Sequence, residues 1–186
     1  PVKQVKKLVD SGMLGWPLKV TVSAHTGFDW KINRWNGKFD NKVEPVPQGF
    51  DYDMWLGPAP ERPYTKHHTS QSFRGYWDYD GGGLGDMAMH YLDPIQYFLG
   101  KDNTSPIRVE VDTDDQHPFV VKSWRKVRLI YADGCEIILD GDNSMKGAAY
   151  IEGPEGKLFR DFKSDIPNLR EKLASFPEPE THSNKA

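Results

Sequence analysis

A carboxylate and an imidazole stand one helical turn apart near the middle of the chain. Asp86, His90 and Asp93 are spaced at i, i+4 and i+7, so a helix places all three on one face. A carboxylate in this position can hydrogen-bond the imidazole, fix its tautomer and raise its proton affinity. The spacing therefore predicts a general acid/base, with His90 carrying the proton and Asp86 as its partner. A surface or structural contact is the open alternative.

A run of glycines, Gly81-Gly82-Gly83, directly precedes this pattern. Such a run marks a place where the backbone turns sharply or approaches something closely. It is not a dinucleotide-binding fingerprint, because residues 76–80 are aromatic and acidic, whereas the fingerprint needs a hydrophobic strand there. We expect Gly82 and Gly83 to be peripheral, at most, to any cofactor.

Apolar residues recur at helical spacing from Leu84 to Leu99 and predict a helix with one buried stripe. Pro94 cannot donate a hydrogen bond to the carbonyl of His90, so a kink is expected directly after His90. Alternatively, Asp93 caps a second helical segment that begins at Pro94. Gly100 is the expected end of the element.

Residues 27–80 show no steady period and are rich in aromatic residues and prolines. Disordered segments are poor in aromatic residues, so an ordered, aromatic-walled insertion is predicted. Flat rings with polar edges suit the apolar faces of a sugar, and nearby polar side chains suit its hydroxyls. The candidate substrate-binding residues are Trp30, Tyr76 and Trp77 for the rings, with Asp78, Arg74 and His68 for the hydroxyls. Simple packing of these rings on a sheet is the alternative.

A metal site is not expected. His67 and His68 are adjacent, and no third ligand follows at a useful spacing. A metal hydrolase built from His67, His68, Asp86 and His90 is the last of three functional hypotheses.

Composition narrows the class of protein. The 186 residues carry a net charge of −3, which gives no basic footprint for nucleic acid, and no apolar run approaches the length of a membrane helix. The one cysteine, Cys135, rules out an internal disulfide and is expected to be a buried, inert thiol. The chain starts at Pro1 and resembles a piece of a longer protein, so its compartment stays open.

The remaining patterns indicate an α+β fold with an open, mostly antiparallel sheet and helices on one face. Alternation at 18–24 predicts a strand. Turn signals at Asp133-Gly134 and at Pro154-Glu155-Gly156 predict two hairpins. A domain is expected over 1–163, followed by a short helix and loose tail over 164–186.

With these elements in place, the chain resembles the C-terminal substrate domain of the Gfo/Idh/MocA oxidoreductases. The motifs that carry the resemblance span nearly the whole chain, and the most specific is Gly82-Gly-Leu-Gly-Asp86-Met-Ala-Met-His90. The segments 53–64 resemble a subgroup with an inserted aromatic loop, often exported from bacteria. The later hairpins, 131–134 and 152–156, also match.

The resemblance implies a nicotinamide-dependent oxidoreductase that acts on a sugar, polyol or glycoside hydroxyl. It implies that His90 moves the hydroxyl proton, that Asp86 orients His90 or binds substrate, and that NAD or NADP binds to an N-terminal Rossmann domain. That domain and its catalytic lysine are missing from this chain, so the fragment alone is expected to bind no cofactor and to be inactive. The family position two after Asp86 is often glycine and is Ala88 here.

A second hypothesis is a noncatalytic carbohydrate-binding or oligomerisation module. An open sheet with one uncovered face suits a homo-oligomer, and the aromatic insertion alone suits glycans. The substrate, the choice between NAD and NADP, and a bacterial compartment (exported, periplasmic or cytoplasmic) are not fixed by the residues.

Overall fold

The computed structural model describes residues 2–28 and 35–179. The described residues fall into two compact units. Unit 1 comprises residues 2–28, 90–112 and 125–179, and unit 2 comprises residues 35–89 and 113–124. Helix α3 belongs to both, because its first half lies in unit 2 and its second half in unit 1.

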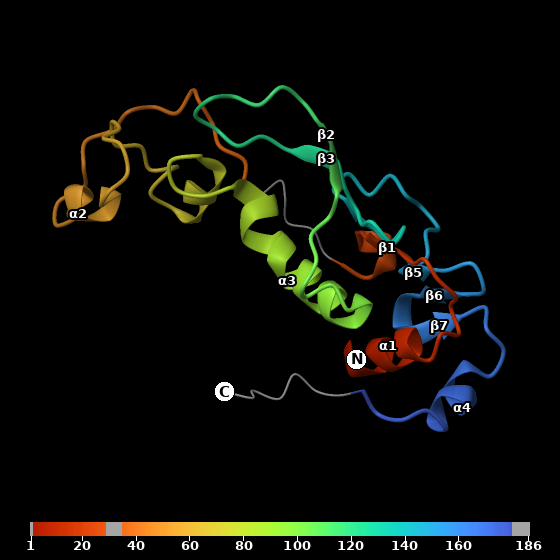
Figure 1. Cartoon of the computed structure of the whole chain (residues 1–186). Coiled ribbons are helices and arrows are strands. Elements are labelled where there is room, and N and C mark those ends of the chain that lie inside the picture. The colour runs from red at the N-terminus through yellow and green to blue at the C-terminus, as the bar shows by residue number, and fades with distance from the viewer. Residues whose placement is uncertain (1, 29–34, 180–186) are drawn as a thin grey trace. The chain divides into compact units, whose positions relative to one another are not determined.

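Unit 1 is built on one seven-stranded sheet with the order β2-β3-β4-β1-β5-β6-β7. Figure 1 labels each of these strands except β4. The strands are β1 (Lys19–Val22), β2 (Arg108–Thr113), β3 (Trp124–Ile130), β4 (Glu136–Asp140), β5 (Ile151–Glu152), β6 (Lys157–Phe159) and β7 (Lys163–Ser164). The pairs β3–β4, β1–β5, β5–β6 and β6–β7 are antiparallel. An open, mostly antiparallel sheet with helices confirms the predicted α+β class.

Both predicted hairpins are present. In the first, Ile130 pairs with Glu136 across the turn at Ala132-Asp133-Gly134, where Gly134 has a φ of +84° that favours glycine. In the second, Glu152 pairs with Lys157 across the turn that contains Pro154. Its strands are short, with two residues in β5 and three in β6.

The place of β1 in the sheet was not predicted. It lies between β4 and β5 and runs parallel to β4, with Val20 opposite Ile137. Both faces of β1 are covered, since Val20, Thr21 and Val22 are all buried. The sequence alternation at 18–24 predicted the strand but not its parallel partner.

The helices of unit 1 share its core with the sheet. Helix α1 (Val2–Asp10) buries Val5 and Leu8, and α4 (Leu169–Ala174) buries Leu169 and Leu173. The central strands β1 and β4 are buried along most of their length, whereas every residue of the edge strand β2 is exposed or half-buried. Two short 3-10 turns, η1 (Ala24–Thr26) and η4 (Arg160–Phe162), join strands to the next segments.

Helix α3 (Gly82–Leu99) confirms the helix expected from the apolar period. Ala88, Ile95 and Phe98 are buried along the predicted stripe, and Gly100 follows with a φ of +65°. Pro94 lies inside one uninterrupted helix, so the alternative in which Asp93 caps a separate segment is wrong. The missing Pro94 donor does not divide the helix, since buried residues on its second half hold it against the core.

Unit 2 contains little regular structure: the α3 start, α2 (Tyr52–Leu56) and the 3-10 turn η3 (Gln71–Gly75). Its chain segments approach so closely that a Cβ on Gly75 would lie 2.2 Å from the Gly37 nitrogen. Tyr76 forms an isolated bridge with Val120, which joins the 35–89 segment to residues 113–124. The described part of the predicted aromatic insertion is thus packed without long helices or strands.

Candidate functional site

Helix α3 carries both residues of the predicted acid/base pair. The helix starts at Gly82, which has a φ of +68°. A Cβ atom at this position would lie only 2.6 Å from the Val121 side chain, so only glycine fits. Asp86 follows one turn later and is half-buried, while His90 is exposed. Within the described residues, the His90 side chain makes no hydrogen bond or ion pair. Its imidazole is therefore available to a ligand.

Asp86 is held by Arg74 rather than by His90. The Nε of Arg74 donates to Oδ1 of Asp86 at 2.8 Å, and each side chain is about one-quarter exposed. The guanidinium also lies 4.6 Å from the centre of the Phe73 ring and 5.3 Å from that of Trp35. These cation–π contacts fix the arginine, which in turn fixes the carboxylate. The Asp86–His90 hydrogen bond that the spacing suggested is not formed.

His68 lies in the interior of unit 2. Its side chain is 2% exposed, with Nε2 2.7 Å from the Tyr52 hydroxyl and Nδ1 3.0 Å from the Thr65 hydroxyl. Since Tyr52 also donates to the Arg62 carbonyl at 2.9 Å, the network is satisfied by a neutral imidazole with its proton on Nε2. Burial lowers the pKa of His68, and His67 lowers it further.

Tyr76 is also a buried residue of unit 2. Its hydroxyl accepts a hydrogen bond from the Asn41 amide at 2.6 Å, donates to the Lys38 carbonyl at 3.2 Å and lies 2.7 Å from Nδ1 of His67. Burial raises the pKa of Tyr76. Tyr76 and His68 are both buried, and both line a pocket of about 200 Å³ in this unit.

The remaining predicted binding residues lie at different depths. Trp77 is 47% exposed and its indole nitrogen donates to the His117 carbonyl at 3.1 Å. Asp78 accepts from Nε of Arg62 at 2.8 Å, and its side chain is 16% exposed. Trp30 lies outside the described residues.

An open pocket of about 480 Å³ in unit 2 brings Asp78 together with aromatic rings. Trp55 and Tyr79 meet edge to face, with ring centres 5.0 Å apart and an angle of 69°. Burial beside Tyr52 raises the pKa of Tyr79 to about 12, so its hydroxyl stays protonated at neutral pH. The pocket lining is Trp55, Leu56, Pro58, Ala59, Pro60, Phe73, Asp78 and Tyr79.

Sequence reasoning missed the rings of this pocket. Trp55, Phe73 and Tyr79 lie in the insertion at 27–80, and no spacing distinguishes them from its other aromatic residues. The available signal is Gly57-Pro58, which ends α2 and leaves Trp55 and Leu56 beside Pro58 and Pro60 in the pocket lining. Arg62 was missed as the partner of Asp78.

The described residues offer no metal site. No group of three or more histidine, cysteine or acidic side chains within 2–28 and 35–179 is arranged to hold an ion. His67 and His68 face Tyr76 and Tyr52 instead.

Comparison with protein families decides what kind of domain this is. The family model described as "Oxidoreductase family, C-terminal alpha/beta domain", of the Gfo/Idh/MocA group, matches residues 1–185. The chain belongs to the Gfo/Idh/MocA oxidoreductase family. It is a C-terminal domain of that family, whose members carry an N-terminal Rossmann domain as its partner.

Two further findings complete the comparison. A search of curated proteins found no match. Among the described helices, none has both the length and the apolar character that a membrane span needs.

Proposed function

We propose that the chain is the substrate-binding and catalytic half of an NAD(P)-dependent oxidoreductase that acts on a sugar, polyol or glycoside hydroxyl. The observation that carries the proposal is the exposed His90 on α3, which has no competing partner among the described residues and lies in a domain of this family. An imidazole at this position suits removal of a hydroxyl proton near neutral pH.

Asp86 has a separate role in the proposal. Because Arg74 already holds one oxygen, the carboxylate is a fixed acceptor one helical turn before His90. A fixed acceptor can orient a substrate hydroxyl, which lowers the entropy lost when the reacting group is placed. We therefore assign Asp86 to substrate positioning and His90 to proton transfer.

NAD or NADP is assigned to a Rossmann domain outside this chain. Gly82 and Gly83 do not fit a phosphate cradle, because the space beside Gly82 is filled by Val121 rather than left open to a ligand. The fragment alone is accordingly expected to show no substrate-dependent formation of reduced nicotinamide.

The experiment compares His90→Ala with Met89→Ala in the full-length protein. Both positions are exposed on α3, so neither change is expected to shift the melting temperature. Loss of a general base lowers kcat by about 10²–10⁴-fold, and Met89→Ala leaves it unchanged. A His90→Ala enzyme with wild-type kcat on every active sugar or polyol contradicts the assignment.

A noncatalytic carbohydrate-binding module is the second candidate, and the pocket of Trp55 and Tyr79 favours it. Its carboxylate is already neutralised by Arg62, which suits a neutral, hydroxyl-rich ligand better than a cation. In this case Trp55→Ala abolishes binding of neutral oligosaccharides in calorimetry, while His90→Ala leaves it intact. Turnover by the full-length protein that depends on His90 decides for the first candidate.

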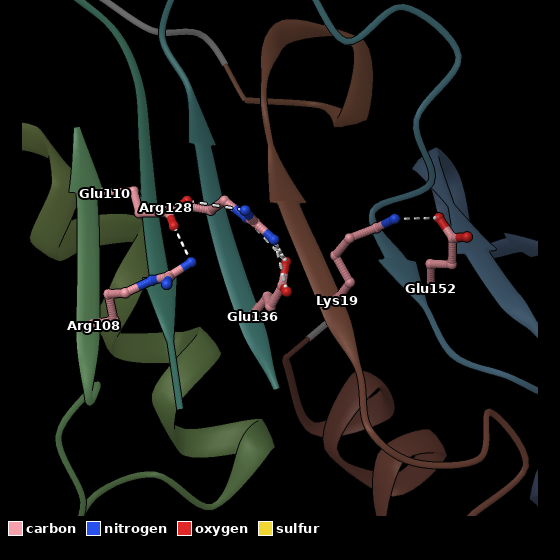
Figure 2. Close-up of polar contacts among 6 residues, drawn as sticks. All are labelled: Lys19, Arg108, Glu110, Arg128, Glu136 and Glu152. Carbon is pink, nitrogen blue, oxygen red and sulfur yellow. Dashed lines mark hydrogen bonds and ion pairs between the residues drawn. The ribbon is translucent and has the colours of Figure 1, made fainter. Parts of the chain in front are cut away.

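A homo-oligomer formed through the charged face of the sheet is also proposed. Figure 2 shows charged side chains paired across neighbouring strands on this face. Arg128 contacts Glu136 at 2.8 Å, and Lys19 contacts Glu152 at 3.1 Å. Ion pairs that neutralise one another in this way allow a second sheet to cover the face without leaving single charges buried.

A further inference from the structure

The outer edge of the sheet, strand β2, exposes an unusual apolar stripe. Ile107, Val109 and Val111 are 70%, 53% and 55% exposed. They alternate with Arg108 and Glu110, so they share one face of the sheet, the face opposite the charged one in Figure 2. No other stretch of the described residues exposes three large apolar side chains at this alternating spacing.

The outer edge of β2 is open to pairing. β2 stands at the end of the strand order, so its outer backbone groups have no strand beside them among residues 2–28 and 35–179. Residues 107–113 contain no proline and no lysine, the residues that commonly block edge pairing. An exposed edge strand of six residues, with Val109 and Val111 on one of its faces, is a template for another strand.

The charges along β2 select the partner strand. Residues 108–112 read Arg-Val-Glu-Val-Asp, with opposite charges at the two ends and the two valines placed symmetrically about Glu110. In an antiparallel pair of identical strands centred on Glu110, each Arg108 faces the Asp112 of the other copy, and each Val109 faces a Val111. The two-fold axis places both apolar stripes on the same side of one continuous sheet.

The two facing Glu110 side chains are compensated. Each carboxylate contacts the guanidinium of Arg108 in its own chain, and its other oxygen lies 2.9 Å from Arg128 (Figure 2). Asp112 is similarly held by Arg125. Because Glu136 also contacts Arg128, the charges around each Glu110 balance: Arg108 and Arg128 are matched by Glu110 and Glu136. The two facing Glu110 carboxylates are therefore neutralised, and their like charge does not prevent close approach.

We propose that two copies of this chain pair edge to edge through β2, antiparallel and in register about Glu110. This surface is distinct from the charged sheet face and does not depend on the oxidoreductase function. The contact involves about six residues per strand, so the pair is small and its formation depends on protein concentration.

The first experiment is a charge swap, read by analytical ultracentrifugation of the 186-residue chain across a concentration series. Arg108→Asp places like charges opposite each other at both ends of the pair, and so does Asp112→Arg. Each single change is expected to weaken association at least tenfold. The double variant R108D/D112R restores opposite charges and returns association to within about threefold of the original. The positions are exposed, and melting temperatures verify that every variant folds.

The second experiment tests the register by disulfide formation. In the proposed pair, Glu110→Cys places two thiols directly opposite, within the distance that a disulfide spans. In Val109→Cys, the two new thiols are displaced along the strands, with Cα atoms about 8 Å apart, so they are too far apart to bridge. The native Cys135 is buried and gives little background.

The outcomes separate this edge from other interfaces. Covalent dimers in Glu110→Cys but not in Val109→Cys, together with rescue by the double swap, support the proposal. A chain that stays monomeric at every concentration overturns it. So does association that all three charge variants leave unchanged, or a cross-link that forms in Glu136→Cys on the sheet face and not in Glu110→Cys.

Discussion

At the scale of single residues, Asp86 is defined by the arginine that it meets. Spacing along α3 suggests a partnership with His90, but Arg74 of the preceding 3-10 turn occupies the carboxylate. An ion pair at this depth keeps the aspartate in one place and leaves the imidazole exposed. The two residues of the α3 motif thus have different environments, which is what distinct roles in positioning and proton transfer need.

The buried His68 makes the stability of unit 2 depend on pH. Its pKa lies below the ordinary value of 6.5 because burial disfavours the imidazolium, so the folded state keeps it neutral. The unfolded chain takes up the proton as the pH falls through about 6.5. The contribution of His68 to the free energy of unfolding is therefore fully present above about pH 6.5 and decreases as the pH falls toward the lower pKa of the folded state.

We expect His68→Phe to flatten this dependence. In urea unfolding, the wild-type chain should have a smaller free energy of unfolding at pH 5.5 than at pH 7.5. In the variant, the free energies of unfolding at these two pH values should differ less. Phenylalanine approximates the volume and removes the titrating group, while Tyr52 keeps its bond to the Arg62 carbonyl. If the free energy of unfolding depends on pH equally in both proteins, the pH dependence comes from groups other than His68.

Cys135 is predicted to be unreactive in the folded protein. It is fully buried, and burial raises the pKa of its thiol to about 11, so almost no thiolate is present at pH 8. Ellman's reagent should titrate no thiol in the native chain and one thiol per chain in denaturant. Rapid reaction of the native chain would mean that the strand beside it opens readily.

At the scale of elements, the helices and hairpins that depend on local sequence pattern could be predicted from the sequence. The hairpin at 124–140 follows from Asp133-Gly134 between two alternating runs, and α3 follows from its apolar period. The pairing of β1 with β4 could not be predicted, because it joins segments that share no turn. The Arg74–Asp86 contact could not either, since it depends on a 3-10 turn that has no periodic signal.

The crossing of two backbone segments at Gly37 and Gly75 gives an element-scale prediction. A methyl group on Gly75 would lie 2.2 Å from the Gly37 nitrogen and 2.4 Å from the Asn36 carbonyl carbon, so the backbone must move. Gly75→Ala should lower the free energy of unfolding by about 3 kcal/mol or more.

Gly49→Ala is the matched control for this substitution. Gly49 has a φ of +82° with open space around it, so alanine there costs only the backbone conformation, about 1–2 kcal/mol. Equal losses in the two variants, measured by chemical denaturation, would contradict a steric origin for the Gly75 effect.

At the scale of the whole molecule, the chain is divided between a sheet unit and an irregular unit. Unit 1 has a continuous hydrogen-bonded sheet, whereas unit 2 relies on side-chain networks such as those of Tyr76 and His68. Such networks have fewer backbone bonds per residue, so local opening is expected to cost less there than in the sheet.

Hydrogen exchange of Tyr76→Phe tests this division. The change removes a buried hydroxyl that contacts Asn41, Lys38 and His67, at a cost of about 1–3 kcal/mol. Exchange should accelerate through residues 35–89 and 113–124, while the amides of β1 and β4 keep wild-type protection. Uniform acceleration over both units would show that they unfold together.

The central position of β1 has a consequence for synthesis of the chain. This strand is made before the rest of the sheet, and its partner β4 follows more than a hundred residues later, so β1 stays unpaired until β4 is made. The neighbouring strands β2 and β3 are made first, β4 then pairs with β3, and β1 inserts beside β4 afterwards. In newly made chains that stall before residue 136, β1 is therefore exposed, and the chain binds chaperones or aggregates.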